Sequence, residues 1–246
     1  IINFINMQIS GNKILITGGG SGIGLGLTER FIKEGNSVII CGRRESVLKE
    51  VSKKFPDVII KNCDLSNEEE RIDLYNWIIE NHSDTNVLIN NAGIQNWMNI
   101  DDGTFYKYSQ EEITTNIIAP VHLAILFSRL KSVKTIMNVT SGLAFIPLAK
   151  VPIYSATKAF MRSFTLSLRH QLKESKIEVI EIIPPALNTD LGGKGIHDAY
   201  PSVSDFIESI FKQLKNGCVE LTFGMSEERL KENNETIIKG FNFMNF

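Results

Sequence analysis

The chain has 246 residues, of which 43% are hydrophobic and 22% are charged, and its formal net charge is −2. This composition is typical of a globular protein and offers no basic excess with which to bind nucleic acid. The three cysteines and four histidines lack the spacing of a disulfide framework or a metal site. We therefore expect a reduced, cytoplasmic protein with neither a metal nor a nucleic-acid partner.

Membrane insertion is not expected either. No apolar run reaches the ~18–20 residues that a membrane-spanning helix needs. The first residues also lack the basic start and the continuous apolar core of a signal peptide. We interpret residues 1–9 as an N-terminal extension.

Short β-rich runs alternate along the chain with longer helical patterns. Strands are predicted at residues 13–17, 37–41, 57–61, 86–89, 133–140, 177–183 and 219–223, and helices at 22–34, 45–55, 68–80, 110–131, 153–174 and 204–215. The tail, residues 225–246, is charged and helical at first, and its aromatic end is expected to pack on the body. The alternation predicts one α/β domain over residues 1–246, a Rossmann-type doubly wound parallel sheet of about seven strands with helices on both faces.

A glycine-rich turn joins the predicted first strand to the first helix. Its residues are Gly18, Gly19, Gly20, Ser21, Gly22, Ile23 and Gly24. Glycines let backbone N–H groups approach a pyrophosphate closely, and the N-terminus of the following helix favours the negative charge of the phosphates. The turn therefore predicts a dinucleotide site, although its spacing is wider than the common GxGxxG pattern.

The end of the second strand carries information about which dinucleotide binds. An acidic residue there would accept hydrogen bonds from the adenosine ribose of NAD, but this chain has Arg43 and Arg44 after Cys41 and Gly42. A guanidinium group matches a 2′-phosphate by charge-assisted hydrogen bonds. We expect NADP, with Arg43 as the main contact, and keep NAD as the alternative.

Five further features occur in a fixed order. Tyr154 and Lys158 are four residues apart on a predicted helix and so share one face. Ser141 lies thirteen residues before Tyr154, Asn116 lies in the long helix, and the Asn90–Gly93 stretch follows the fourth strand. Together with the glycine turn, these motifs resemble the short-chain dehydrogenase/reductase family across essentially the whole chain. The segments around Ser141 and Tyr154 are similar to its DltE-like bacterial branch.

The resemblance implies an oxidoreductase that interconverts a carbonyl and an alcohol by hydride transfer. A phenol can donate a proton to the carbonyl oxygen as negative charge develops there, so Tyr154 is the expected general acid/base. Ser141 would orient the substrate oxygen. The ammonium group of Lys158 would lower the pKa of Tyr154, and by resemblance Lys158 also binds the nicotinamide ribose. Asn116 would hold a water of a proton relay.

The resemblance also implies further cofactor contacts. Asp64, followed by Leu65, would contact the adenine, and Asn91, Ala92 and Gly93 would form the wall beside the adenine ribose. In the stretch that begins at Pro184, Thr189 would hydrogen-bond the nicotinamide carboxamide. Ala186 stands in this stretch where the family has glycine.

The substrate is a small molecule that the sequence does not identify. Apolar residues that flank the inferred site are candidates for its pocket: Trp97, Leu143, Leu187 and Leu191. Residues 190–204 form the expected substrate loop. The two long helices, residues 110–131 and 153–174, would associate in a homodimer or homotetramer.

Two other functions stay open at the level of sequence. One is an NAD-dependent alcohol dehydrogenase of the same family. The other is a catalytically silent, cofactor-binding regulatory protein, which would be marked by the loss of one of the four catalytic residues. Ser141, Tyr154, Lys158 and Asn116 are all present.

Overall fold

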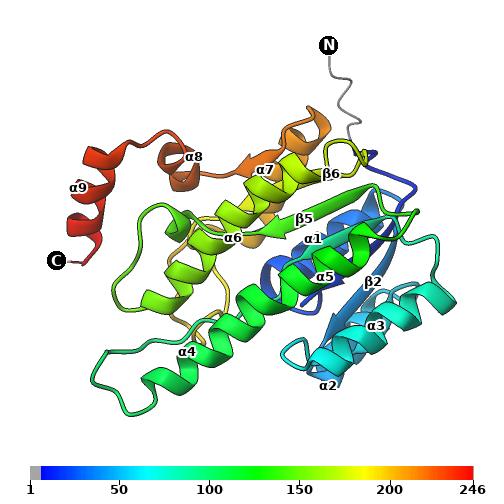
Figure 1. Ribbon diagram of the computed structural model, residues 1–246, viewed down its shortest axis with the longest axis horizontal. Helices are drawn as coiled ribbons and strands as arrows, with labels where there is room; N and C mark the ends of the chain where they lie inside the picture. Colours follow the sequence, from blue (N-terminus) through cyan, green and yellow to red (C-terminus); the bar gives the residue numbers. More distant parts are fainter. Residues whose placement is uncertain (1–6, 246) are drawn as a thin grey trace.

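The computed structural model describes residues 7–245 (Figure 1). Seven parallel strands form one sheet, in the order β3-β2-β1-β4-β5-β6-β7. The strands are β1 (Lys13–Thr17), β2 (Ser37–Gly42), β3 (Ile59–Asn62), β4 (Val87–Asn90), β5 (Thr135–Val139), β6 (Glu178–Ile183) and β7 (Glu220–Thr222). The helices are α1 (Gly22–Lys33), α2 (Glu45–Lys54), α3 (Glu68–Asn81), α4 (Phe105–Ile113), α5 (Ala119–Ser128), α6 (Pro152–Gln171), α7 (Val203–Lys215), α8 (Met225–Arg229) and α9 (Asn234–Asn245). The predicted doubly wound sheet is confirmed.

The strand order reverses direction between β1 and β4. The chain first winds outward from β1 through β2 to β3, and then returns to place β4 on the other side of β1. In open parallel sheets of this kind, ligands bind in the crevice at the carboxyl ends of the strands, where the order reverses. The glycine turn follows β1 and lies at this edge.

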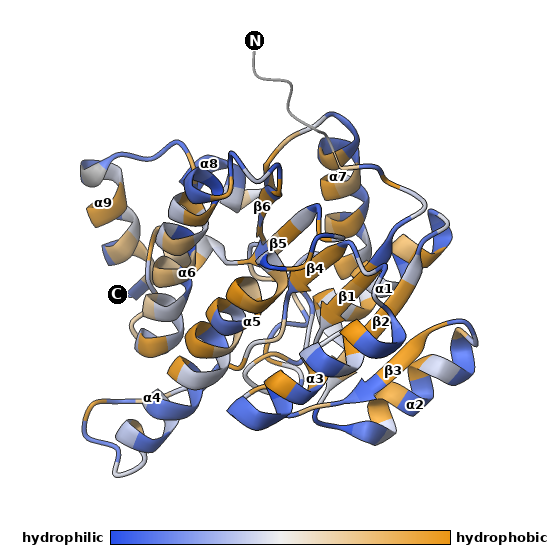
Figure 2. Cartoon of the chain, turned by 45° about the vertical axis from the view of Figure 1, so that its right-hand side comes forward, coloured by the Kyte–Doolittle hydropathy of each residue, from blue (hydrophilic) through white to orange (hydrophobic). Residues whose placement is uncertain are grey.

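Two separate cores cover the two faces of the sheet. Ile14 and Ile16 of β1 pack with α1, α2 and α7, whereas Leu15 between them packs with α3, α5 and α6. The strands are accordingly apolar on both sides and lie between helices whose polar residues face outward (Figure 2). This double burial fixes the register of each strand, because a slip by one residue would exchange the two cores.

The long helix before β5 differs from its prediction. It begins at Phe105 and not at residue 110, and a π-helical turn, η1 (Thr114–Ile118), joins α4 to α5. The buried residues of α4 are Ser109 and Glu112, so its inward face carries no apolar periodicity by which the start could be recognised.

Pro120 explains the π-helical turn. A proline has no N–H group, so the carbonyl of the residue four positions earlier, Asn116, has no helical donor. The chain widens instead, and the N–H of Ala119 bonds to the carbonyl of Thr114, five residues earlier.

The tail is helical further than predicted, since α9 includes the aromatic end up to residue 245. It packs on the body as expected: Asn245 accepts a hydrogen bond from the N–H of Ala149 at 2.6 Å and donates one to the carbonyl of Pro147 at 3.2 Å. Phe243 is nevertheless exposed. Residues 1–6 of the expected N-terminal extension, and Phe246, lie outside the described residues.

Close approach of backbones holds the glycine turn in place. A Cβ on Gly24 would collide with the carbonyl oxygen of Gly18 and would come within 2.5 Å of Nδ2 of Asn91. Gly18 itself has a φ of +65°, in the left-handed region that favours glycine. The turn after β1 and the loop after β4 can thus pack closely because the glycines have no side chains.

We predict that Gly24→Ala lowers the free energy of unfolding by about 1–3 kcal/mol, because the added methyl group must displace backbone. Urea unfolding measures this change. Gly103→Ala is the matched control, since a Cβ there meets nothing within 4 Å and φ is not positive. Equal stability of Gly24→Ala and the wild type would contradict the tight packing.

Candidate active site

The N-terminus of α1 presents free backbone donors at the glycine turn. Ser21 is the residue before the helix, yet its side chain makes no capping hydrogen bond, and the first turn carries no acidic residue. Across the crevice, Thr189 lies 3.5 Å (Cγ2) from the position that a Cβ on Gly22 would occupy. An uncapped helix N-terminus beneath a glycine-lined opening fits a pyrophosphate group.

The two arginines after β2 lie at the same edge. Arg43 and Arg44 are both exposed, and Nη2 of Arg44 donates to Oγ of Ser21 at 3.5 Å. The backbone carbonyl of Arg43 accepts from Nδ2 of Asn62 at 3.2 Å. The residue that the structure sets against the glycine turn is therefore Arg44, whereas the sequence favoured Arg43.

The predicted adenine contacts follow β3. Asp64 uses Oδ1 to accept from the N–H and the hydroxyl of Ser66, at 2.9 and 2.8 Å. Leu65 is buried in the core, and its carbonyl accepts from Nη1 of the buried Arg71 at 2.6 Å. Nε of Arg71 in turn donates to Nδ1 of His122 at 3.1 Å, so this wall of the crevice is tied to α5.

The loop after β4 is fastened to the end of β1. Oγ1 of Thr17 accepts from the N–H groups of Asn91 and Ala92, at 2.9 and 3.0 Å. Nδ2 of Asn91 donates to the carbonyl of Thr17 at 2.9 Å. A Cβ on Gly93 would lie 3.7 Å from Nζ of Lys158. The predicted ribose wall therefore leads from the glycine turn to Lys158, the predicted catalytic lysine.

Three of the predicted catalytic side chains meet between β5 and α6. Ser141 precedes the short 3-10 turn η2 (Gly142–Ala144), and its Oγ accepts from the N–H of Leu143 at 3.1 Å. A side-chain hydrogen bond joins Ser141 to Tyr154. Nζ of Lys158 lies 5.5 Å from the centre of the Tyr154 ring and donates to the carbonyl of Val139 at 2.8 Å. All three side chains are buried.

Burial controls the proton affinities of this group. It raises the pKa of Tyr154 above its ordinary value, the hydrogen bond from Ser141 lowers it, and the carboxylate of Glu112 raises it further. Burial lowers the pKa of Lys158 to about 8. The pKa of Tyr154 is thus raised overall, and not lowered as expected, because removal of the phenolate from water is the largest effect.

Asn116 is brought to the same place by η1, but its side chain is already engaged. Oδ1 accepts from the N–H of Ile94 at 2.9 Å, and Nδ2 donates to the carbonyl of Ile94 at 2.8 Å and to Oγ1 of Thr157 at 3.3 Å. Pro120, four residues after Asn116, offers the main-chain carbonyl of Asn116 no α-helical donor.

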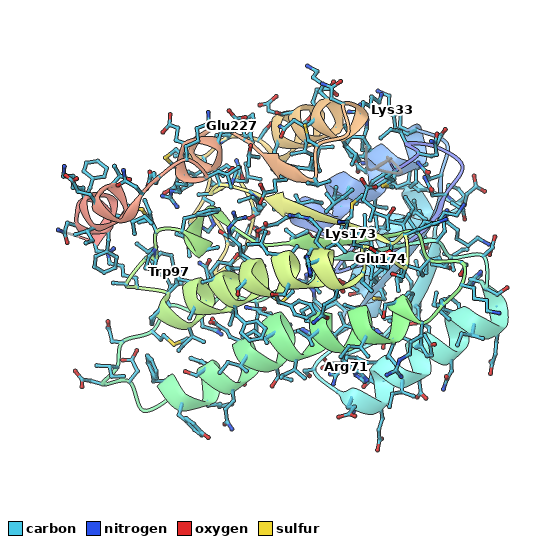
Figure 3. All side chains as sticks on the ribbon, turned by 45° about the horizontal axis from the view of Figure 1, so that its top comes forward. Lys33, Arg71, Trp97, Lys173, Glu174 and Glu227 are labelled. Atoms are coloured by element: carbon cyan, nitrogen blue, oxygen red, sulfur yellow. The ribbon has the colours of Figure 1, made fainter. Side chains whose placement is uncertain are left out.

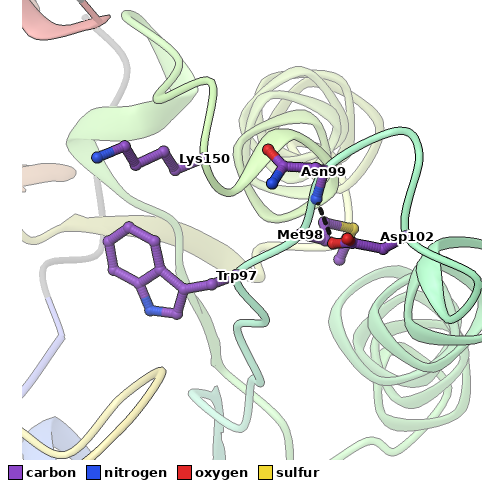
Figure 4. A pocket seen from close by; sticks show the side chains of 5 residues that line it. All are labelled: Trp97, Met98, Asn99, Asp102 and Lys150. Atoms are coloured by element: carbon purple, nitrogen blue, oxygen red, sulfur yellow. Dashed lines mark hydrogen bonds between the residues drawn. The ribbon is translucent and has the colours of Figure 1, made fainter.

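The substrate side is formed by two loops that lie against each other. A Cβ on Gly192, in the predicted substrate loop, would lie 2.7 Å from Nε2 of Gln95 and 3.1 Å from Nε1 of Trp97. Trp97 lines a pocket of about 220 Å³ with Met98, Asn99, Asp102 and Lys150 (Figure 4). The indole of Trp97 and the side chain of Lys150 thus border this pocket on the side of the loop that follows β4.

The four predicted pocket residues do not share one environment. Trp97 lines the pocket, and Leu143 and Leu191 are half-buried. Leu187 is buried in the apolar core that includes α7, and its assignment to the pocket stays a prediction. Pro184 is likewise buried, and its carbonyl accepts from the N–H of Gly142 at 2.9 Å.

Sequence reasoning missed Glu112 and Arg229. Glu112 is fully buried, and its place one helical turn before Asn116 was the available signal. Arg229 comes from the tail, and its Nη1 lies 3.2 Å from the position of a Cβ on Gly142, next to Ser141. No sequence pattern links those two segments, so only the fold reveals this approach. Figure 3 shows how densely side chains fill the space between the helices.

Within residues 7–245, no group of three or more His, Cys, Asp or Glu side chains could hold a metal ion. In the same range, no helix has the length and apolar character to cross a membrane.

Comparison with known proteins identifies the family. The model of the short chain dehydrogenase family matches residues 12–199. The chain is 42% identical over 225 residues to the uncharacterized oxidoreductase DltE of Bacillus subtilis (strain 168), covering 88% of this chain and 89% of that protein. It is 31% identical over 175 residues to the NADP-dependent 3-hydroxy acid dehydrogenase YdfG of Shigella flexneri, covering 70% and 71%.

A solved structure agrees with this result. A short chain dehydrogenase from Burkholderia cenocepacia J2315 in complex with NADP superposes with a TM-score of 0.83, at 25% identity, over 96% of this chain and 99% of the other. The fold, the family match and the relatives indicate the same family. The chain belongs to the short-chain dehydrogenase/reductase family and is an NAD(P)-dependent oxidoreductase that acts on alcohol and carbonyl groups.

Proposed function

We propose that the protein is an NADP-dependent reductase that converts a small carbonyl compound into an alcohol, with Tyr154 as general acid. The observation that carries this proposal is that Tyr154 and Lys158 lie buried one turn apart on α6, with Nζ of Lys158 5.5 Å from the centre of the Tyr154 ring, and that Ser141 is buried at the end of β5. Bound NADPH supplies the hydride. The protein supplies orientation and a proton.

Each catalytic side chain has a role that follows from its contacts. A carbonyl oxygen placed against Ser141 and Tyr154 receives a hydrogen bond from each hydroxyl, and the phenol transfers its proton as charge develops on that oxygen. Lys158, with its pKa of about 8, exchanges protons readily at neutral pH. The main-chain carbonyl of Asn116 would hold the water that returns a proton to the site.

The raised pKa of Tyr154 favours the reductive direction. A phenol that holds its proton at neutral pH is ready to donate it, whereas alcohol oxidation needs the phenolate. Lys158 and the positive charge of oxidised nicotinamide would both stabilise the phenolate, and would allow the reverse reaction at higher pH.

The preference for NADP rests on charge at the end of β2. Arg43 and Arg44 are exposed beside the glycine turn, and no carboxylate occupies the strand end. Among similar proteins, YdfG is named as NADP-dependent, and one solved structure contains NADP, whereas another, from Burkholderia phymatum, contains NAD. The sign of the two guanidinium groups favours the 2′-phosphate.

We predict that Tyr154→Phe abolishes NADPH oxidation, because phenylalanine keeps the ring but has no proton to give. NADPH binding, followed by fluorescence, should change less than about threefold, since the ring packing is kept. A panel of aldehydes, ketones, quinones, 3-oxo acids and 3-oxoacyl thioesters provides substrates for the wild type. Full activity of Tyr154→Phe on a substrate from this panel would refute the catalytic assignment.

We predict that the double variant Arg43→Ala, Arg44→Ala loses at least about tenfold in NADPH affinity and little in NADH affinity, because each guanidinium pairs only with the 2′-phosphate. Isothermal titration measures both affinities. The single variants separate the two arginines, and we expect Arg44→Ala to lose more because of its contact with Ser21. Equal loss of NADPH and NADH affinity would contradict the 2′-phosphate argument.

We further propose that the chain forms a homodimer or homotetramer through α5 and α6. Large apolar side chains are exposed on these two helices: Ile125 on α5, and Phe160 and Leu166 on α6. Exposed apolar surface on neighbouring helices is typical of a protein contact.

The predicted cytoplasmic location fits the free cysteines of the protein, of which Cys41 and Cys63 are buried.

We predict that Leu166→Glu shifts the wild-type oligomer toward the 27.6 kDa monomer in light scattering, because a charge would be buried in the interface. Ile72→Glu, on α3, is the matched control, since Ile72 is exposed at 38% and Leu166 at 44%. A wild type that is already monomeric at micromolar concentration would refute the interface.

A further inference from the structure

Two side chains of the α4–η1 segment hold alternate residues of the loop that leads to the substrate side. Oδ1 of Asn116 accepts from the N–H of Ile94 at 2.9 Å, and Oε1 of Glu112 accepts from the N–H of Asn96 at 2.5 Å and from its Nδ2 at 3.1 Å. A helix rises about 6 Å in four residues, and an extended chain about 6.6 Å in two. The spacings match, so the loop is pinned at two successive points.

The Glu112 carboxyl group is engaged at one oxygen only. The residue has no exposed surface, and in the part of the chain that the structure describes Oε2 has no hydrogen-bond partner. The anchoring of the loop explains why Oε1 accepts two hydrogen bonds from Asn96, but the amide oxygen of a glutamine could accept them equally well. A buried carboxyl group with a free oxygen is costly, so its charge calls for a separate explanation.

The elements around Glu112 identify the group on which its charge acts. On α6, the titratable side chains at the site are Tyr154 and Lys158, and the loop from residue 94 to 98 carries none. On its own helix, Tyr108 precedes it by one turn, and Glu111 points to solvent. One turn after Glu112, Nδ2 of Asn116 donates to Oγ1 of Thr157 at 3.3 Å, and that hydroxyl donates to the carbonyl of Tyr154 at 2.7 Å, so the segment that carries Glu112 is fastened to the turn of α6 that begins at Tyr154. In agreement with this placement, the carboxylate of Glu112 raises the pKa of Tyr154.

We propose that Glu112 is a positioning residue with two effects: it anchors Asn96 of the substrate-side loop, and its negative charge holds the proton on Tyr154, which favours carbonyl reduction over alcohol oxidation. This proposal rests on the proposed function, because it takes Tyr154 as the acid. Lys158 and oxidised nicotinamide act on the phenol in the opposite sense. Glu112 therefore sets how far the site is biased toward proton donation.

The pH dependence follows from the sign of each charge. Burial raises the pKa of Glu112 to about 7, and the hydrogen bonds from Asn96 lower it. Above that pH the carboxylate is present, and it delays the ionisation of Tyr154. Below that pH Glu112 is neutral and loses this effect, but Tyr154 is then protonated in any case. The effect should appear on the alkaline side of the profile.

The central test is Glu112→Gln, which keeps the acceptor for Asn96 and removes the charge. We expect the alkaline fall of kcat/KM for reduction, and the alkaline rise of kcat/KM for oxidation, to move about one unit toward lower pH. Glu112→Asp keeps the charge and should keep the wild-type midpoint while KM rises. Glu111→Gln, which removes an exposed charge from the same helix, should leave the profile unchanged.

A second measurement does not depend on turnover. Because the folded-state pKa of Glu112 lies above the unfolded value, the stability that this group contributes is fully present below the unfolded pKa and is lost as pH rises through about 7. Urea unfolding should show this decline in the wild type and in Glu111→Gln, and a smaller decline in Glu112→Gln.

These experiments distinguish a failure of the role proposed for Glu112 from a failure of the role proposed for Tyr154. If Glu112→Gln keeps the wild-type profile while Glu112→Ala has a raised KM, Glu112 is only a loop anchor and the charge effect is refuted. If Glu112→Gln moves both midpoints toward higher pH, the sign is wrong and the proposal fails. If Tyr154→Phe retains full activity, the proposed function fails instead, whatever Glu112 does.

Discussion

The proposed chemistry depends on the burial of three predicted catalytic side chains, Ser141, Tyr154 and Lys158, between β5 and α6. Tyr154 and Lys158 have little contact with water, so their proton affinities are set by a few fixed neighbours. Ser141 and the carbonyl of Val139 are the direct partners. The sheet holds these partners on one side and the long helices hold them on the other. The two cores that cover the faces of the sheet therefore fix the positions of the groups that the proposed reaction uses.

The same principle joins the cofactor crevice to the catalytic group. Thr17 fastens the loop after β4 through Asn91 and Ala92, and Asn116 with Glu112 fastens the continuation of that loop at Ile94 and Asn96. One continuous segment is therefore fixed from the glycine turn to the substrate side by side chains of β1 and α4. Rigidity of this kind keeps reacting groups in place without further cost at the moment of reaction.

The sequence predicts the sheet, the glycine turn and the catalytic residues because each depends on local pattern or on a motif at fixed spacing. It fails where contacts join distant segments. The start of α4 cannot be recognised because Ser109 and Glu112 face inward, and the packing of Leu187 in the core with α7 joins distant segments. The contact of Arg44 with Ser21 depends on how two loops meet, which no periodicity encodes.

Burial acts on the three titratable groups of the site in a single direction, toward their neutral forms. It raises the pKa of Tyr154, lowers that of Lys158 to about 8 and raises that of Glu112 to about 7. A proton that passes from the ammonium group of Lys158 to an ionised Tyr154 would remove two charges, which a medium that opposes charge favours. Reduction of a carbonyl needs such a proton at the moment when hydride arrives. A tyrosine whose ionisation is unfavourable, beside a lysine that readily exchanges its proton, is suited to donate a proton to the carbonyl oxygen and to be reprotonated afterwards.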